Sequence, residues 1–571
     1  MKKLLVYLKN YKGESVCAPL FKLLEAVFEL IVPLIVASII DRGIADGDRA
    51  YIVQMCLVLV GLGVVGMVSA ITAQYFAAKA AAGFGRELRH DLFDKISCLS
   101  FAQIDAFSTS SLITRITSDV NQVQSGVNLV LRLFMRSPFI VGGAVVMAFV
   151  LDSCAGLIFA GVVAMLCVVI FGIMAATMPR YKKIQSALDG LTKMTRENLT
   201  GARVIRAFCA EEREQSRFIA QNNLLNTLQK ATGRISALLN PVTLVIINVG
   251  IVLLIEYGAF RVDTGALSQG QVVALYNYMS QILIELLKLA NLIITVTKSF
   301  ASAGRITAVL SADTQVRLTS DKSSKDDFAV SFSHVSFSYH TTGKAALSDI
   351  SFTAGPGEVI GVIGSTGSGK STLVNLIPRF YDAQSGRITL FGREITSYTR
   401  SELKKLIGVV PQKAVLFQGT IADNLRWADE KADEAAMTAA VQAAQAQDVV
   451  DSKGGLDAQV EQEGRNFSGG QRQRLSIARA LTGRPPVLIL DDSASALDFA
   501  TEKRLRGAIR NLPYHPVVFM VSQRSSTVMH ADKIIVLDEG RAVGIGTHDE
   551  LMRTCGVYRE IYDSQFKGGE A

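Results

Sequence analysis

Six long apolar segments in the first half of the sequence limit what this part of the chain can fold into. Each has close to or more than the ~20 residues that an α-helix needs to cross a bilayer. They cover residues 16–40, 51–78, 127–151, 154–178, 236–262 and 271–297. The 571-residue chain is 49% hydrophobic, and its mean hydropathy of +0.30 is too high for an ordinary soluble enzyme. The sequence therefore predicts a membrane protein with six transmembrane helices.

The lysines and arginines indicate how these helices are oriented. They gather at the N-terminus and in the long connections 79–126 and 179–235, whereas the connections 41–50, 152–153 and 263–270 are short. Because positive residues favour the cytoplasmic side, we expect both termini and the long connections in the cytosol. The net charge of +8 has the same explanation, so nucleic acid is not an expected partner.

The two long connections keep helical periodicity, which predicts that the spans continue into the cytosol. Each connection is expected to double back at a short turn helix, near 102–109 and near 198–209. Residues 1–12, MKKLLVYLKNYK, place apolar side chains on one face and lysines on the other, as in a helix that lies in the membrane interface. Residues 13–310 would then form the transmembrane domain.

A polar stretch at 311–327 is the predicted linker to a second domain at 328–571. In that domain, β-rich runs such as VIGVIG and VLILD alternate with helical runs. This alternation predicts an α/β fold with a mainly parallel sheet. The chain is thus expected to combine a six-helix transmembrane domain with a cytosolic α/β nucleotide-binding domain.

The strand VIGVIG is followed by GSTGSGKST, which matches the phosphate-loop pattern G-x-x-x-x-G-K-[ST] in the required strand, loop and helix context. Its glycines let backbone N–H groups approach the phosphates, Lys370 would reach the β and γ phosphates, and Ser371 would bind Mg²⁺. The predicted phosphate-binding residues are Gly364, Ser365, Thr366, Gly367, Ser368, Gly369, Lys370, Ser371 and Thr372. The pattern indicates binding of ATP or GTP.

Further along, residues 466–481 read NFSGGQRQRLSIARAL, and this run resembles the signature of the ATP-binding cassette (ABC) transporter family. Six spans followed by such a domain resemble an exporter-type half-transporter, over essentially the whole chain. In that family two nucleotide-binding domains meet head to tail, and each ATP lies between the phosphate loop of one and the signature of the other. The resemblance implies ATP and Mg²⁺ as cofactors, a second half-transporter as partner, and a location in the cell membrane.

The resemblance also implies roles for single residues. Tyr339 would stack on the adenine, and Gln412 would contact Mg²⁺ and sense the membrane domain. Asp491, at the end of VLILD, matches the aspartate linked to Mg²⁺ through water, and Asp498 lies in the loop that crosses the dimer. The partner's ATP would be capped by the signature residues Ser468, Gly469, Gly470 and Gln471.

The same resemblance assigns the two turn helices to coupling with the nucleotide-binding domains, the second of them reaching the partner chain. Residues 461–466, EQEGRN, lie where the exporter family places a loop that touches these helices. This sequence differs from the commoner GERG form, so the resemblance supports the location of this loop more than its contacts.

Two positions depart from the family pattern. Active members follow the Mg²⁺ aspartate with a glutamate that polarises the attacking water, whereas this chain has Asp492, which is one methylene shorter. A misplacement of about 1 Å can lower a rate on the order of 100-fold. The family also has a histidine after the strand VVFMVS, and this chain has Gln523, which cannot carry the imidazole's charge or shuttle a proton. The site is therefore expected to hold MgATP and to turn it over slowly.

The signature of this chain is intact, and a signature serves the partner's ATP. This asymmetry resembles one subunit of a heterodimeric exporter, with an impaired site on this chain's phosphate loop and a competent site at its FSGGQ. The alternatives are a homodimer with two weak sites, a site whose aspartate works unaided, and a regulatory subunit whose ATP site acts as a latch for a channel or sensor. An importer of siderophores with the same fold is a further alternative.

Charged residues inside the predicted spans are candidates for substrate contact, because their desolvation is costly and they usually face the bundle interior or a wet cavity. They are Lys22, Glu25, Glu29, Glu256, Glu285 and Lys288. We expect Lys22 to snorkel, Glu256 to lie at the interface, and Glu285 either to pair with Lys288 or to face the substrate cavity. Amphipathic drugs, lipids or peptides would suit such a cavity.

Overall fold

The computed structural model describes residues 4–313, 328–339 and 345–566. Most of the predicted linker, 311–327, therefore lies outside the described residues. The chain divides into two compact units. The first contains Met1–Cys98 and Ser108–Ala312, and the second contains Leu99–Phe107 and Asp313–Ala571.

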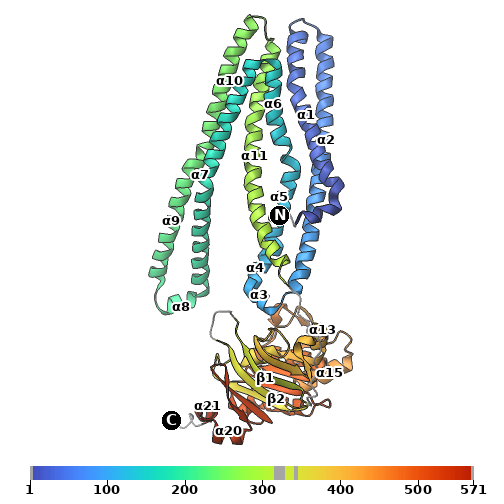
Figure 1. Cartoon of the computed structure of the whole chain (residues 1–571), viewed down its shortest axis with the longest axis vertical. Coiled ribbons are helices and arrows are strands. Elements are labelled where there is room, and N and C mark those ends of the chain that lie inside the picture. Colours follow the sequence, from blue (N-terminus) through green and yellow to red (C-terminus); the bar gives the residue numbers. More distant parts are fainter. Residues whose placement is uncertain (1–3, 314–327, 340–344, 567–571) are drawn as a thin grey trace. The chain divides into compact units, whose positions relative to one another are not determined.

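Helices make up the first unit (Figure 1). In the described part of the chain, six helical segments are long and apolar enough to span a membrane: Leu4–Ile44, Arg49–Ser97, Thr109–Leu151, Ser153–Thr200, Glu211–Asp263 and Gln269–Leu310. Their elements are η1 (Leu4–Tyr11), α1 (Lys12–Ser38), η2 (Ile39–Ile44), α2 (Arg49–Ser97), α4 (Thr109–Thr114), η3 (Arg115–Asp119), α5 (Val120–Leu133), α6 (Arg136–Leu151), α7 (Ser153–Thr200), α8 (Ala202–Ala207), α9 (Glu211–Ala237), α10 (Leu239–Asp263) and α11 (Gln269–Leu310). The six-helix membrane domain predicted from the apolar segments is confirmed.

The helices extend well beyond a bilayer. Helix α2 has 49 residues, or about 74 Å at 1.5 Å per residue, against a hydrocarbon core of about 30 Å. Helix α7 has 48 residues, and the short helix α8 follows it directly. The long helical extensions expected from the sequence are therefore present, and their cytoplasmic location remains a prediction.

Local sequence explains where the helices begin and how they pack. Asp48 caps α2, Asp152 caps α7, and Ser268 forms a capping box with Gln271 at the start of α11. All three caps lie at the short connections. Alanines such as Ala26 are fully buried and let neighbouring backbones approach closely, as small residues do in membrane helices. Helix α9 packs on α7, whereas α2 and α11 pack on α5.

The second unit is an α/β domain. A six-stranded sheet has the order β12-β11-β3-β10-β9-β6, and a four-stranded sheet has the order β2-β1-β4-β5. The strands are β1 (Val330–Phe337), β2 (Leu347–Ala354), β3 (Val359–Gly364), β4 (Ser385–Leu390), β5 (Arg393–Glu394), β6 (Ile407–Val410), β7 (Gly419–Thr420), β8 (Gln459–Val460), β9 (Val487–Asp491), β10 (Val517–Val521), β11 (Lys533–Asp538) and β12 (Arg541–Gly546). In the six-stranded sheet only the β11–β12 pairing, among described residues, is antiparallel.

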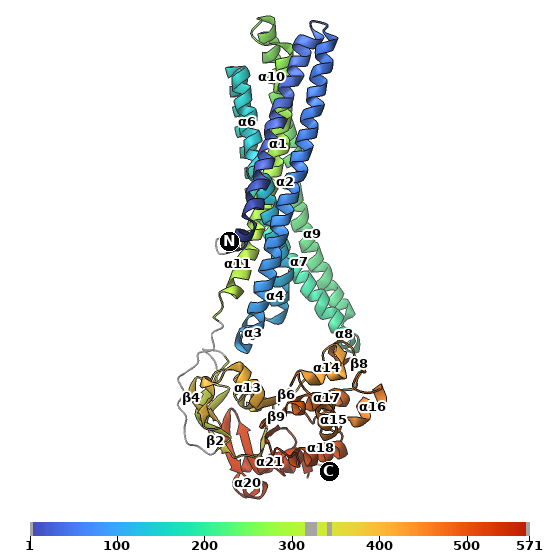
Figure 2. The ribbon, with the colours of Figure 1, turned by 90° about the vertical axis from the view of Figure 1, so that its right-hand side faces the viewer.

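Helices surround this sheet. They are α3 (Phe101–Phe107), α12 (Lys370–Leu376), η4 (Ile395–Ser397), α13 (Arg400–Leu406), α14 (Ile421–Arg426), α15 (Glu434–Ala443), α16 (Gln447–Lys453), η5 (Gln462–Gly464), α17 (Gly469–Thr482), α18 (Phe499–Arg510), α19 (Ser525–Val528), α20 (His548–Thr554) and α21 (Gly556–Phe566). Figure 2 shows α14 to α17 on the opposite side of the six-stranded sheet from β2 and β4.

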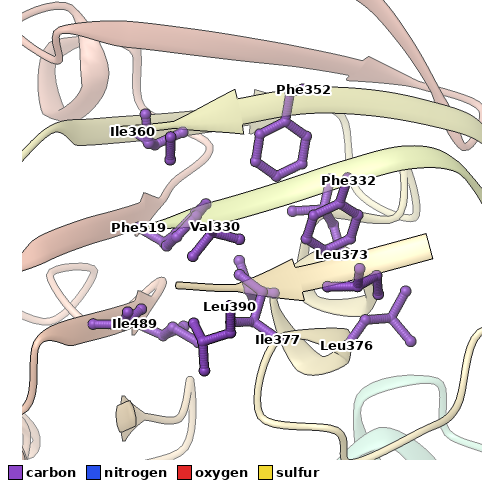
Figure 3. Close-up of a cluster of buried hydrophobic side chains, with 14 of the residues drawn as sticks. Val330, Phe332, Phe352, Ile360, Leu373, Leu376, Ile377, Leu390, Ile489 and Phe519 are labelled. Atoms are coloured by element: carbon purple, nitrogen blue, oxygen red, sulfur yellow. The ribbon is translucent and has the colours of Figure 1, made fainter. Parts of the chain in front are cut away.

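One hydrophobic core of this domain lies between its two larger sheets, and a second lies against the helices α14 to α18. Phe332 of β1 and Phe352 of β2 stack with their ring centroids 4.7 Å apart, and Phe519 of β10 packs edge-on against Phe352. Figure 3 shows these rings together with Ile360 and Leu373. Strands β9 and β10 are buried along their whole length, which explains why they read as unbroken apolar runs. This packing fixes the ends of β3, β9 and β10, where the predicted site residues lie.

Candidate nucleotide site and its connections

The predicted phosphate loop connects β3 to α12. Gly367 has φ +82° and Gly369 has φ +100°, so both use the left-handed region that favours glycine. A Cβ added at Gly369 would lie 2.8 Å from the carbonyl oxygen of Ala346, whereas one at Gly367 would point into open space. The glycines therefore turn the chain tightly while leaving the inside of the loop free.

The polar groups of this loop fit a phosphate. Lys370 Nζ donates to the carbonyl oxygens of Gly364 and Ser365 at 2.8 and 2.7 Å, so it is held across the loop. Ser368 Oγ is buried and has no hydrogen-bond partner among the described residues. Burial lowers the pKa of the Lys370 ammonium, although the carboxylates of Asp492 and Asp491 act in the opposite direction. An unpaired buried donor and a poorly solvated cation are both better satisfied by a bound phosphate.

Two of the three predicted Mg²⁺ residues, Ser371 and Asp491, meet at the start of α12. Ser371 Oγ donates to Asp491 Oδ1 at 3.0 Å. Burial raises the pKa of Asp491, and the charge of Asp492 adds to this rise, while Ser371 and Lys370 oppose it. A divalent cation would neutralise this crowded pair of carboxylates, and the oxygen donors suit Mg²⁺. When bound, Mg²⁺ supplies positive charge that offsets the charge of the β and γ phosphates.

The two positions that depart from the family pattern lie on neighbouring strand ends. Asp492 has φ +46°, and its N–H donates to the carbonyl oxygen of Val521 at 3.0 Å. Its Oδ2 accepts a long hydrogen bond of 3.4 Å from Gln412 Nε2. Gln523 follows Val521 by two residues, and its side chain is exposed. The structure therefore brings Gln412, Asp491 and Asp492 together at one edge of the sheet.

Tyr339 lies beside the phosphate loop. Its hydroxyl is 3.1 Å from Thr372 Oγ1, and its ring packs edge-on against Phe337 and Tyr381. About half of the residue is exposed. An exposed aromatic ring held next to a phosphate loop is suitably placed to stack on a base.

The signature residues form the start of α17. Ser468 is its N-cap, and it forms a capping box with Gln471: the N–H of Gln471 donates to Ser468 Oγ, and the N–H of Ser468 donates to Gln471 Oε1. A Cβ on Gly470 would lie 2.9 Å from the carbonyl oxygen of Ala496, so glycine is needed there. The 14-residue helix thus presents a capped N-terminus, which favours anions. Asp498 similarly caps α18, and its hydrogen bond from Thr501 lowers its pKa.

The first turn helix, α3, belongs to the same compact unit as the nucleotide-binding domain. Phe101 stacks on Phe380 at 4.2 Å, and Tyr381 donates a hydrogen bond of 2.7 Å to Asp105. Burial, and then the hydrogen bond to Asp105, raise the pKa of Tyr381 above its usual value. Since the Tyr381 ring also contacts Tyr339, the turn helix is connected through two tyrosines to the predicted adenine residue. Sequence reasoning missed Tyr381 and Asp105, because their contact spans 276 positions.

A network of buried charges joins α1, α6 and α11 in the membrane unit. Arg136 is only 7% exposed. It donates to both carboxylate oxygens of Glu29, at 2.7 and 2.8 Å, and to Glu285 Oε1 at 2.9 Å. Its Nε lies 3.8 Å from Glu25. Sequence reasoning did not include Arg136 among the intramembrane charges, although it lies inside the third apolar segment.

Lys22 and Lys288 each pair with a glutamate of this network. Lys22 does not snorkel, because it is 8% exposed and paired with Glu25 at 2.5 Å. The expected pairing of Glu285 with Lys288 is present at 2.8 Å. Glu285 also accepts a hydrogen bond from Ser137 and is 4% exposed, so its oxygens are already bonded within one copy of the chain. Its contact with substrate remains a prediction.

A six-helix membrane domain fused to a phosphate-loop domain with an FSGGQ helix defines an ATP-driven half-transporter. Comparison with known proteins agrees. The ABC transporter transmembrane region family matches residues 16–286, and the ABC transporter family matches residues 347–495.

Relatives extend this match over the whole chain. An uncharacterised ABC transporter ATP-binding protein of Mycobacterium tuberculosis strain H37Rv is 35% identical over 565 residues, 98% of this chain and 97% of the relative. YfiB of Bacillus subtilis strain 168, also an uncharacterised ABC transporter ATP-binding protein, is 35% identical over 567 residues, 99% of each chain. The solved structure of a bacterial Atm1-family ABC exporter with ATP bound has the same fold, with a TM-score of 0.80 at 24% identity, and covers 97% of this chain and 98% of that one.

The chain therefore belongs to the ABC transporter family. It is a multi-pass plasma-membrane protein, and its ABC domain couples ATP hydrolysis to transport.

The Tyr381–Asp105 hydrogen bond predicts a measurable coupling effect. In Tyr381→Phe the ring contacts remain and only the hydroxyl is lost, so MgATP affinity should stay within about twofold of wild type while substrate-stimulated ATPase or transport falls. The hydrogen bond to a carboxylate is worth about 1.5–3 kcal/mol. Nucleotide titration and transport assays on the assembled transporter measure the two effects. Tyr514→Phe, which removes a buried hydroxyl that has no hydrogen-bond partner among the described residues, is the matched control. An unchanged coupling ratio in Tyr381→Phe contradicts the assignment.

The charge network predicts a specific rescue. Lys22, Arg136 and Lys288 balance Glu25, Glu29 and Glu285, so Arg136→Met leaves one uncompensated negative charge in a buried site. Breaking such a network costs about 3–5 kcal/mol. We expect a lower Tm and less monodisperse protein for Arg136→Met, and partial recovery when Glu285→Gln is added, because the sum of charges returns to zero. Equal losses in the single and double variants contradict a charge-balanced network.

Proposed function

We propose that this chain is one subunit of a heterodimeric ABC exporter and that its own phosphate loop forms the slowly hydrolysing site of the pair. Its partner is a different half-transporter with the glutamate and histidine that this chain lacks. The signature of this chain, Ser468 to Gln471, serves the partner's ATP. Amphipathic compounds such as drugs, lipids or peptides are the proposed substrates.

The observation that carries this proposal is the way in which Asp492 is held. Its N–H is bonded to Val521, the last residue of the adjacent strand β10, so its backbone cannot advance to make up for the missing methylene. The shorter carboxylate therefore stays drawn back from the position that a glutamate would reach. With Gln523 in place of a histidine, two groups that act on the attacking water are weakened, while the phosphate and Mg²⁺ residues are retained.

The signature of the same domain supports the asymmetry. The capping box of Ser468 and Gln471 is complete, and the close approach of Gly470 to Ala496 is kept. Nothing in the start of α17 is weakened in the way that Asp492 and Gln523 are. A chain that served two identical sites would gain little from an intact signature facing impaired phosphate loops.

Exposed apolar residues support a protein partner. On and beside α8, Leu199, Val204 and Phe208 are 74%, 60% and 79% exposed. In the nucleotide-binding domain, Phe417 and Trp427 stack on each other at 4.3 Å and are both exposed. We propose that α8 packs on the partner's nucleotide-binding domain and that the Phe417–Trp427 stack receives the corresponding helix of the partner. Both surfaces would then be removed from water.

The charged residues of the membrane unit support a proposal about where the substrate passes. Glu29 and Lys288 have side chains that are 37% and 41% exposed, at the two ends of the network around Arg136. We propose that these two exposed ends, together with Glu285 behind them, mark the wall of the substrate path. A site with both signs of charge next to apolar helices suits amphipathic molecules.

A double variant tests the proposed function. Asp492→Glu with Gln523→His restores the longer carboxylate and the imidazole, and two copies of this variant would contain every hydrolytic group because the signature is already complete. ATPase activity of the purified chain should rise by roughly 10- to 100-fold, as expected for restoring about 1 Å of reach. Phosphate release under saturating MgATP is the measurement.

The matched control is Asp492→Asn with Gln523→His, which has the imidazole but no carboxylate, and no gain is expected from it. An unchanged rate in the glutamate variant, with normal ATP affinity, is inconsistent with an impaired site.

A further inference from the structure

The last described helix, α21, turns one face toward the nucleotide-binding domain. Tyr558, Ile561, Tyr562 and Gln565 follow the i, i+3, i+4, i+7 spacing of a single helical face. Tyr558 is fully buried in a cluster with Leu551, Val528 and Val536, against which Ile561 also packs, and its hydroxyl is 2.8 Å from His548 Nδ1. This packing fixes the helix, and two turns after Tyr558 the same face ends at Gln565.

The side chain of Gln565 holds the loop that contains Gln523. Its Oε1 accepts from both the N–H and the hydroxyl of Ser525, each at 2.8 Å. Its Nε2 donates to the carbonyl oxygen of Gln523, also at 2.8 Å. The amide therefore uses its acceptor and one donor on two residues of one turn, which fixes both the position and the direction of the Gln523 backbone.

This loop lies at the edge of the sheet that carries the predicted phosphate and Mg²⁺ residues. It follows β10, which is paired in parallel with β3 on one side and with β9 on the other. Strand β3 leads into the phosphate loop, and β9 ends at Asp491. The carboxyl ends of the three strands therefore bring the Gln523 loop to the edge that holds the phosphate residues.

Helix α19, which follows the loop, is held separately. Thr527 Oγ1 donates to Glu502 Oε1 at 2.7 Å, and Arg506 Nη1 donates to the carbonyl oxygen of Ser526 at 3.1 Å. These contacts come from α18 and reach residues 526 and 527, but not residue 523. Among the side-chain contacts described for the loop and for α19, it is the hydrogen bond from Gln565 that reaches Gln523 itself.

We propose that Gln565 is a positioning residue for ATP: it holds the Gln523 loop so that the Gln523 side-chain amide can donate a hydrogen bond to the γ-phosphate. This role rests on the proposed function, in which the site retains ATP. In this role Gln565 connects the C-terminal helix to the side chain that would tell ATP from ADP.

The test measures nucleotide discrimination in the full-length protein. Gln565→Ala should weaken binding of a non-hydrolysable ATP analogue with Mg²⁺ by roughly 3- to 10-fold, the size of one lost hydrogen bond, and leave ADP affinity within about twofold of wild type. Gln565→Glu keeps the acceptor for Ser525 but loses the donor to Gln523, so it should also lose discrimination. Ser564→Ala, on the exposed side of the same helix, is the control.

A second readout needs no nucleotide. The N–H of Ser525 donates to Gln565, so amide hydrogen exchange at Ser525 should become faster in Gln565→Ala and stay slow in Ser564→Ala. Equal loss of affinity for the analogue and for ADP would show a purely structural role and overturn the proposal, as would unchanged discrimination in Gln565→Ala.

These outcomes are separable from those of the proposed function. Fast ATP hydrolysis by the wild-type chain would contradict the slow site, yet discrimination between the analogue and ADP would still report on Gln565.

Discussion

The parallel hydrogen bonding of β9 with β10 is the constraint on which the nucleotide site depends. It places Asp491 opposite Val521, and the next N–H along, that of Asp492, donates to the Val521 carbonyl. Both strands are buried along their length, so neither can shift without opening the core around Phe519. The backbones of Asp491, the proposed Mg²⁺ residue, and of Asp492, the proposed replacement for the glutamate, are thus both held in place by this pairing. The adjacent β3 adds the phosphate loop to the same edge.

Contacts on either side of this edge connect it to the turn helix α3 and to the C-terminal helix α21. Tyr339 connects the phosphate loop, through Tyr381, to Asp105 of the turn helix α3. On the other side, Gln565 connects the Gln523 loop to the C-terminal helix. Each connection consists of side chains with few conformations, held by packing and by hydrogen bonds. The turn helix and the C-terminal helix are therefore each joined to predicted nucleotide-site residues by direct side-chain contacts.

Local sequence patterns predicted the features that depend on residues close together in the chain. The spans follow from runs of about 20 apolar residues, and the phosphate loop follows from glycine spacing after an apolar strand. The contacts that were missed join distant positions: Arg136 meets Glu285 149 residues away, and Gln565 meets Gln523 42 residues away. The expectation for Lys22 was wrong because its partner, Glu25, lies one turn along the same buried face, and pairing there satisfies the ammonium without exposure.

A single-turnover experiment on the purified wild-type chain tests the central claim, that its site holds ATP with little hydrolysis. Bound ATP labelled at the γ-phosphate is followed after excess nucleotide is removed. The chain should retain the label and release phosphate on the order of 100-fold more slowly than the roughly 10 s⁻¹ typical of enzymes. Rapid release followed by repeated turnover on addition of fresh MgATP, by the wild-type chain without a partner, would contradict it.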